Sequence, residues 1–191
     1  MLNRQMLRNI CRAAIAEDVG SGDATTLAVV PEDLEIEALM NVREDCVCAG
    51  IPVAEVLFSE LDRGCVTEPL VDEGTPCRAG RAVARITGKA RAILTGERTA
   101  LNFVQRLSGI ATLTRQYVDA TGKMHAQILD TRKTTPGLRL LEKYAVEKGG
   151  GVNHRFGLYD RIMIKDNHRL VASLEGPGGI RRAVAAARST H

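Results

Sequence analysis

The chain has 191 residues and a formal net charge of +3, with 45% hydrophobic and 26% charged residues. These values are typical of a soluble globular protein that can bury a core, and the length predicts one or two domains. The small net charge and the aromatic content of only 3% argue against a nucleic-acid-binding protein, which needs a basic surface and often stacked aromatic rings.

The N-terminus and the cysteines indicate the compartment. No stretch approaches the roughly 20 apolar residues of a membrane span, and Arg4, Arg8 and Arg12 interrupt the segment in which a signal peptide would have its apolar centre. The sequence therefore predicts a cytoplasmic protein without a membrane partner. The five cysteines form an odd set with no Cys-x-x-Cys pair, which favours reduced, mostly buried thiols over disulfides or a zinc site.

The first hundred residues or so predict a small α+β unit with an antiparallel sheet. Apolar residues at helical spacing predict a helix over 2–14, and "EDVGSGDATT" follows as a turn in which Asp23 caps a helix. Strict alternation over 34–42 predicts a half-buried strand. Pro52 opens a further helix, and "CVTEPLVD" and "GRAVARITG" predict two short strands.

The second half of the chain has a different rhythm. The segment "KARAILTGERTALNFVQRLSGIATLTRQYVDATG" predicts one long helix, or two helices broken near Ser108 and Gly109. After it, "AQILD" and "DRIMIKD" predict short buried strands, and "GLRLLEKYAVEK" and "GPGGIRRAVAAARST" predict helices. Strands and helices that alternate in this order indicate parallel βαβ units in an α/β layer or barrel.

The length of this second part is short for a barrel. A (β/α)-barrel normally takes about 250 residues, whereas the chain ends at His191, where another strand should begin. We therefore expect an incomplete barrel in a chain that is a truncated product or a piece of a longer protein.

Cationic side chains follow both predicted C-terminal strands. "LDTRKTTPG" places Thr131, Arg132 and Lys133 after the first strand, and "IMIKDNH" places Lys165 after the second. Because the reactive groups of parallel α/β folds collect at the carboxyl ends of strands, we expect these side chains to meet on one face.

The loop "GGGVNHRFG" adds His154 and Arg155 to the same face. Such a cluster of cations repels itself unless an anion of comparable charge lies among them. Arginine binds a planar carboxylate through two parallel hydrogen bonds, and lysine supplies a compact charge suited to phosphate. The cluster therefore predicts a ligand, or a pair of ligands, that carries both carboxylates and phosphates.

Each part of this cluster also has an ordinary structural interpretation. Arg132 and Lys133 would form a solvated loop, His154 would be a surface or core histidine, and glycines 149–151 would first be a helix stop. Arg98, in "GERTALN", lies on a predicted helical face, where a solvated arginine is the default.

Three segments carry a family resemblance: "EDVGSGDATT", "GERTALNFVQRLSGIAT" and "LDTRKTTPGLRLLEKYAVEKGGGVNHRFGLYDRIMIKDNH". They closely resemble quinolinate phosphoribosyltransferase, and the match extends over nearly the whole chain. The resemblance implies an N-terminal α/β sandwich domain in residues 1–101, followed in residues 102–191 by the first part of a truncated (β/α)-barrel. It also implies a homodimer or higher homo-oligomer in which two subunits share each active site.

The activity that the resemblance implies is a pentosyl transfer in de novo NAD biosynthesis. The family joins quinolinate to 5-phosphoribosyl-1-pyrophosphate (PRPP), with Mg²⁺ present, and forms nicotinate mononucleotide, pyrophosphate and carbon dioxide. By position, Arg132 and Arg155 would bind the quinolinate carboxylates, with His154 and Lys133 beside them. Lys133 and Lys165 would also face PRPP, and these two are the predicted catalytic residues.

Two more residues complete the substrate site that the resemblance implies. Thr131 would add a hydroxyl donor, and Arg98 matches the arginine that the family sends across the dimer interface into the partner's site. The family's acidic residues for Mg²⁺ and the ribose hydroxyls have no match in residues 1–191, so we predict no metal ligand within this chain. We also expect the chain alone to bind quinolinate weakly and to turn over little or nothing.

The main alternative is a non-carboxylating or non-catalytic relative of the same fold, such as the paralogue associated with molybdate transport. The segments "TRKTTPG" and "NHR" favour the quinolinate enzyme, because both arginines for the carboxylates are present. Quinolinate-dependent release of carbon dioxide would separate the two. A basic nucleic-acid-binding module is the second alternative, and it predicts an affinity that falls steeply with salt.

Overall fold

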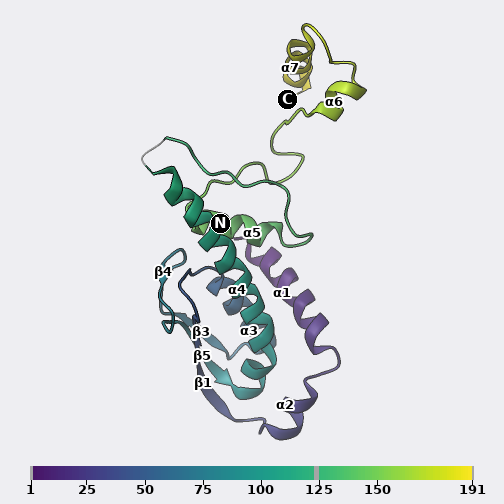
Figure 1. The fold of residues 1–191 in the computed structure, drawn as a ribbon. Coiled ribbons are helices and arrows are strands. Elements are labelled where there is room, and N and C mark those ends of the chain that lie inside the picture. Colours follow the sequence, from purple (N-terminus) through teal and green to yellow (C-terminus); the bar gives the residue numbers. More distant parts are fainter. Residues whose placement is uncertain (1, 123–124, 191) are drawn as a thin grey trace. The chain divides into compact units, whose positions relative to one another are not determined.

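The computed structural model describes residues 2–122 and 125–190, which fall into two compact units, Met1–His154 and Arg155–His191 (Figure 1). No helix in this part of the chain is long and apolar enough to cross a membrane. The first unit contains α1 (Arg4–Val19), α2 (Ala24–Val29), β1 (Glu35–Asn41), β2 (Cys46–Val47), α3 (Ile51–Leu61), β3 (Val66–Pro69), β4 (Pro76–Cys77), β5 (Ala82–Lys89), α4 (Ala90–Thr121) and α5 (Arg139–Lys148). The second contains α6 (Asp166–Val171) and α7 (Gly179–Thr190).

A three-stranded antiparallel sheet in the order β1-β5-β3 forms one layer of the first unit. β1 pairs with one edge of β5 and β3 with the other, while β2 and β4 form a separate two-stranded sheet. The predicted alternation of β1 is confirmed, since Ile36, Ala38 and Met40 are buried or half-buried and the residues between them are exposed. The first unit is therefore the predicted α+β arrangement.

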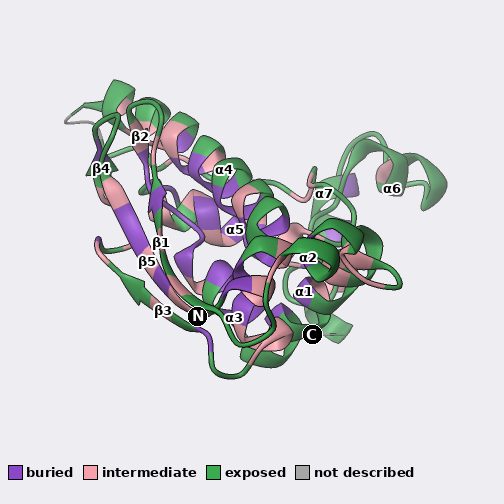
Figure 2. Cartoon of the chain, turned by 90° about the horizontal axis from the view of Figure 1, so that it is seen from below, coloured by how far each residue is buried: buried purple, intermediate pink, exposed green. Residues whose placement is uncertain are grey.

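The hydrophobic core of the first unit lies where this sheet meets α3 and α4 (Figure 2). Leu57 and Phe58 of α3, Val83 and Ile86 of β5, and Leu107 of α4 are each at most 3% exposed. α1 packs against α3 and α4. Every residue of this core cluster precedes residue 146, so the core belongs to the first unit alone.

α4 is one unbroken helix, which decides between the two forms that the sequence predicts for this segment. Ser108 lies inside the helix, and its hydroxyl forms hydrogen bonds with the backbone just before α3. It accepts from the Ala49 amide at 3.0 Å and donates to the Ala49 carbonyl oxygen at 3.2 Å. The helix also runs through the predicted domain boundary between residues 101 and 102. That division stays a prediction.

Two smaller predictions are confirmed in the first unit. The Asp23 carboxylate caps α2 and accepts a hydrogen bond from the Thr26 amide at 3.0 Å. All five cysteines are free thiols and four of them are buried. This is the pattern expected of cysteines that act as small apolar residues in a core.

The two predicted strands of the second half are wrong. Residues 126–130 form only a single parallel bridge, Leu129 to Val152, and residues 160–166 form no strand. Leu129 is 51% exposed and Ile162 is 52% exposed. A buried parallel strand needs a hydrogen-bonded neighbour on each side and a helix over each face, and the described residues offer at most one neighbour. The bridge is parallel, with α5 between its two segments, but Val152 lies in the predicted loop "GGGVNHRFG" and not in the predicted strand "DRIMIKD".

The described residues of the second unit form two helices and no sheet. α7 confirms the helix predicted from "GPGGIRRAVAAARST". Before α6, the Asp160 carboxylate accepts hydrogen bonds from the amides of Phe156 and Gly157 at 2.6 and 2.9 Å and closes a turn. α6 begins at Asp166, so Lys165 precedes a helix instead of following a strand.

Candidate functional site: a cationic loop anchored at both ends

The loop of residues 130–137 carries the adjacent cations that the sequence singles out, and it is anchored at its first residue. The Asp130 carboxylate forms an ion pair with Lys143 of α5, whose ammonium lies 2.7 Å from both carboxylate oxygens. The two side chains are only 7% and 4% exposed. A buried pair of this kind needs further hydrogen bonds to be stable.

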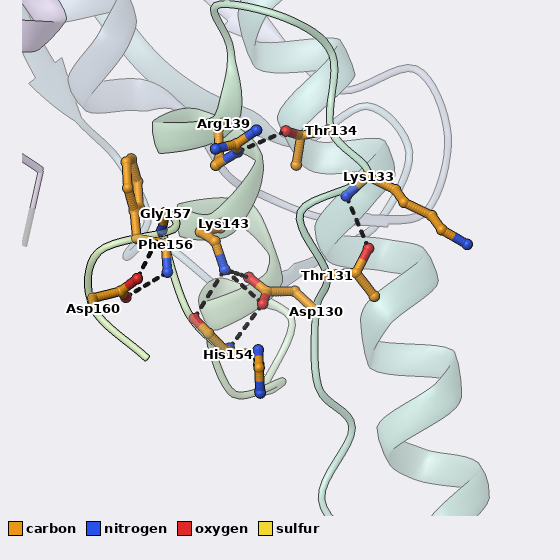
Figure 3. A network of polar contacts seen from close by, with 10 residues as sticks. All are labelled: Asp130, Thr131, Lys133, Thr134, Arg139, Lys143, His154, Phe156, Gly157 and Asp160. Carbon is orange, nitrogen blue, oxygen red and sulfur yellow. Dashed lines mark hydrogen bonds and ion pairs between the residues drawn. The ribbon is translucent and has the colours of Figure 1, made fainter. Parts of the chain in front are cut away.

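Residues 153 and 154 supply these hydrogen bonds, and those of His154 are drawn in Figure 3. The His154 amide donates to Asp130 Oδ1 at 2.8 Å, and Lys143 donates to the His154 carbonyl oxygen at 3.1 Å. In the side-chain orientation that satisfies its neighbours, the Asn153 amide nitrogen donates to Asp130 Oδ2 at 2.7 Å and to the Lys143 carbonyl oxygen at 3.0 Å. One carboxylate thus joins the start of the cationic loop to the segment that carries His154.

A second ion pair anchors the far end of the loop. The Glu142 carboxylate of α5 forms an ion pair with Arg106 of α4 and accepts a hydrogen bond from the Thr135 amide at 3.3 Å. Arg106 also donates a hydrogen bond to the Thr135 hydroxyl. Burial raises the pKa of Glu142, but the hydrogen bonds from Arg106 and Thr135 together bring the pKa below its ordinary value. Glu142 is therefore ionised at neutral pH and ties the loop to α4 and α5.

Between these anchors, the predicted ligand residues have polar groups that the described residues leave unpaired. The Nε atom of Arg132 is buried and has no hydrogen-bond partner among them. The exposed side chain of Lys133 extends away from the Asp130–Lys143 pair (Figure 3), while its backbone amide donates to Thr131 Oγ1 at 3.0 Å. A buried donor without a partner costs about 1–3 kcal/mol. An anion at Arg132 would supply the missing acceptor.

His154 and Arg98, which also belong to the first unit, are placed differently. The side chain of His154 is half-buried, and only its backbone is bonded to Asp130 and Lys143. Arg98 is exposed on α4 and makes no hydrogen bond or ion pair with a described residue. It precedes Arg106 by about two helical turns, or ~12 Å along the axis. Its role in a partner subunit stays a prediction.

Arg155 and Lys165 belong to the second unit. Arg155 is 6% exposed and donates to the Arg161 carbonyl oxygen at 3.3 Å and to Met163 Sδ at 3.5 Å. Lys165 is exposed at the start of α6, and its amide donates to His168 Nδ1 at 3.0 Å. The predicted position of Lys165 at the end of a strand is wrong, because residues 160–166 form no strand and Lys165 directly precedes α6. That all the cations converge on one face stays a prediction.

The described residues do not fit a resident Mg²⁺ site. Within residues 2–122 and 125–190, no three His, Cys, Asp or Glu side chains lie close enough together to hold a metal ion. The two carboxylates beside the loop, Asp130 and Glu142, are already paired with Lys143 and Arg106. The Mg²⁺ that the resemblance implies therefore stays a prediction.

Two domain models of one protein family cover most of the chain. The quinolinate phosphoribosyl transferase N-terminal domain matches residues 23–108, and the C-terminal domain of the same family matches residues 110–191. The chain belongs to the quinolinate phosphoribosyltransferase family. The cationic loop and residues 153–155 all lie within the match to the C-terminal domain.

Curated members of the quinolinate phosphoribosyltransferase family are similar over most of this chain. Quinolinate phosphoribosyltransferase (decarboxylating) 1b of Nicotiana tabacum is 45% identical over 179 residues, which is 93% of this chain and 49% of that protein. The probable nicotinate-nucleotide pyrophosphorylase (carboxylating) of Bacillus subtilis is 45% identical over 167 residues, 87% of this chain and 57% of that protein. The chain spans about half the length of the curated relatives it matches.

Solved structures of the family have the same fold. NadC from Streptococcus pyogenes matches with a TM-score of 0.91 and 40% identity, over 98% of this chain and 66% of that one. The nicotinate-nucleotide pyrophosphorylase from Francisella tularensis matches with a TM-score of 0.90 and 37% identity, over 100% of this chain and 65% of that one. The predicted fold class is confirmed: α/β with an N-terminal antiparallel sheet, in a chain that covers part of a barrel-containing fold.

The residues that anchor the loop are barely marked in the amino-acid sequence. Asp130 has a weak signal, because an acidic residue directly after the apolar pair "IL" lies at a predicted strand end. Lys143 has none, because its partner lies 13 positions away and the helical pattern of α5 does not mark it. Arg106 and Glu142 are likewise invisible as a pair, at a separation of 36 positions.

Proposed function

We propose that this chain binds quinolinate and takes part in carboxylating nicotinate-nucleotide pyrophosphorylase activity, the transfer of phosphoribosyl from PRPP to quinolinate with loss of carbon dioxide. The observation that supports the proposal most strongly is the anchored loop. Arg132 and Lys133 place two positive charges side by side, and the buried Nε atom of Arg132 lacks a partner among the described residues. The loop also lies within the match to the C-terminal domain of the family. The products would be nicotinate mononucleotide, pyrophosphate and carbon dioxide.

The chemistry requires positioning and charge compensation and no protein nucleophile. Displacement of pyrophosphate from C1 of the ribose passes through an oxocarbenium-like state, so the protein has to orient the pyridine nitrogen and offset the negative charge of the leaving group. Arg132 would hold a carboxylate through paired hydrogen bonds, and Lys133 would face the phosphoribosyl donor. Once ribosylated, the ring is a pyridinium whose positive nitrogen stabilises the carbanion left on the adjacent carbon when carbon dioxide departs. A proton from water then takes the place of the carboxylate on that carbon.

The other family-matched residues enter the proposal by position. Thr131 accepts a bond from the Lys133 amide and keeps its hydroxyl proton for a ligand. Arg155 and His154 would complete the quinolinate site, and Lys165 would face PRPP.

A homodimer, a requirement for Mg²⁺ and a cytoplasmic location are also proposed, and each has a simple check. Arg98 would serve the site of the partner subunit, so a protein that sediments as a monomer would remove this role. Turnover that persists in excess chelator would contradict the proposed requirement for Mg²⁺. Recovery of the native protein in a membrane or organelle fraction would remove the cytoplasmic location.

Substitution of Arg132 tests the proposal. Arg132→Ala removes a charge-assisted contact and should weaken quinolinate binding by about 1.5–3 kcal/mol, or roughly 10- to 150-fold, in isothermal titration calorimetry of the whole chain. Arg78→Ala is the matched control, because Arg78 is an exposed cation of the first unit whose salt bridge is with Asp45. If Arg132→Ala and Arg78→Ala bind quinolinate with the same affinity, Arg132 is not part of the site.

A further inference from the structure

The Asp130–Lys143 pair joins the two segments of the first unit that carry proposed quinolinate ligands. Asp130 directly precedes Thr131 and the two cations, and its Oδ1 accepts the His154 amide at 2.8 Å. Lys143 reaches from α5 to both carboxylate oxygens and to the His154 carbonyl oxygen. The backbone on both sides of the proposed site is therefore held through one pair of side chains (Figure 3).

The surroundings of the pair indicate a role in geometry. Both side chains are almost completely buried, and the desolvation of two charges offsets much of their attraction, so a buried ion pair is weak evidence for stability. Its hydrogen bonds, however, are complete. Asp130 accepts from Lys143, His154 and Asn153, and Lys143 directs its protons to Asp130 and His154. A fully satisfied buried network holds its members in one arrangement.

Lys143 has a second effect, which is electrostatic. An unpaired carboxylate at Asp130 would repel a dicarboxylate bound at Arg132, two residues along the chain. The Lys143 ammonium, 2.7 Å from both oxygens, neutralises this carboxylate. The local field then comes from Arg132 and Lys133, and it attracts anions.

We propose that Asp130 and Lys143 are positioning residues for quinolinate binding. They do not touch the substrate; they set the backbone of Arg132 at a fixed place relative to His154 and keep the neighbourhood of the site free of net negative charge. The inference rests on the proposed function, since it assumes that Arg132 and His154 bind quinolinate.

The experiment removes both charges together. In the double variant Asp130→Asn with Lys143→Met, no charge is left buried without a partner, which is the main reason for a single variant to misfold. Tyr144→Phe is the matched control on α5. It removes a hydrogen bond of 2.7 Å from Tyr144 to Glu73, which holds α5 to the N-terminal part of the unit without touching the loop.

Quinolinate affinity and hydrogen exchange at the His154 amide are measured on the whole chain, at a temperature at which circular dichroism shows each variant to be folded. The double variant should lose at least about tenfold in affinity, since small displacements of a binding group have large effects, and its His154 amide should exchange faster. Tyr144→Phe should lower the melting temperature and leave affinity and His154 exchange unchanged. Lys143→Arg, which keeps the charge and leaves no buried carboxylate without a cation, should retain more affinity than the double variant.

Three results would overturn the inference, and they are distinguishable. Equal affinity of wild type and double variant would remove the positioning role, even if the double variant melts earlier. Equal loss of affinity in Lys143→Arg and in the double variant would show that the charge of residue 143 plays no part. Absence of quinolinate binding by the wild type would remove the proposed function, and this inference with it.

Discussion

Charged residues in and beside the cationic loop differ in whether another side chain of the protein pairs with them. Asp130 and Glu142 are paired with Lys143 and Arg106, and they hold the two ends of the loop. Arg132 has a buried Nε for which the described residues offer no acceptor. The paired groups therefore fix the backbone, and the unpaired ones are available to an anion.

The anchor at Glu142 predicts a pH dependence of stability. Burial raises the pKa of Glu142, but the hydrogen bonds from Arg106 and Thr135 bring it below its ordinary value of 4.5 in the folded protein. As the pH falls, Glu142 is therefore protonated at a higher pH in the unfolded chain than in the folded protein. The contribution of Glu142 to stability is complete above the ordinary value and is lost as the pH falls through the folded one.

Glu142→Gln should remove this contribution. We expect the melting temperature of the wild type to fall more steeply than that of Glu142→Gln between about pH 5 and 3, as followed by circular dichroism. Glu32→Gln is the control, because Glu32 is exposed and makes no hydrogen bond or ion pair with a described residue. Parallel curves for wild type and Glu142→Gln would show that Glu142 does not anchor the loop.

Among the elements, α4 connects the core to the candidate site. Its 32 residues begin beside β5 and pack against α3 and α5. Arg106 reaches from it to the far end of the cationic loop, and Arg115 donates to the Gly149 carbonyl oxygen at 3.0 Å, just after α5. The position of α5, and with it of Lys143, therefore depends on an unbroken α4.

The continuity of α4 can be tested at its glycines. Gly109 is exposed, and a Cβ atom there would meet no heavy atom within 4 Å outside the backbone of its own helix. Gly109→Ala should therefore stabilise the protein by about 0.5–1 kcal/mol, because alanine favours the helix. Urea unfolding would measure this, and a loss of stability would mean that the helix is interrupted at this residue.

Gly96 provides the matched control on the same helix. A Cβ atom there would lie 2.6 Å from Leu61 Cδ1 and 3.0 Å from Leu57 Cδ2. Gly96→Ala should therefore destabilise the protein by about 1–3 kcal/mol through overpacking. The same substitution is expected to have opposite signs at the two positions, which separates helix propensity from packing.

In the molecule as a whole, the hydrophobic core and the cationic loop both belong to the first unit. The described residues of the second unit form two helices, and large apolar side chains remain exposed on them, with Val171 at 85% and Ile180 at 69%. Helices that bury so little apolar area gain little stability from packing. The two units should therefore differ in local stability.

Hydrogen exchange should show this difference. We expect the amides of α3 and of the central turns of α4 to exchange most slowly, and those of α6 and α7 to exchange much faster, because opening is easiest where few apolar contacts are lost. Mass spectrometry of peptides from the exchanged chain would measure both in one experiment. Equal protection of α3 and α7 would contradict this expectation.

Features that depend on near neighbours can be predicted from the amino-acid sequence. The cap at Asp23, the helix opened by Pro52, the alternation of β1 and the helical pattern of α7 are all set by residues a few positions apart. The adjacent cations Arg132 and Lys133, and the family to which the chain belongs, could also be recognised at this level.

Tertiary structure alone decided the features whose partners are distant along the chain. Apolar residues 126–130 and 160–166 do not form buried strands, because pairing needs neighbouring strands that the local pattern cannot guarantee. Lys143 anchors the loop because folding brings α5 against Asp130, which lies 13 positions earlier. A charged side chain is stable in a buried place only where its partners are already assembled, and the order of residues along the chain does not show where that is.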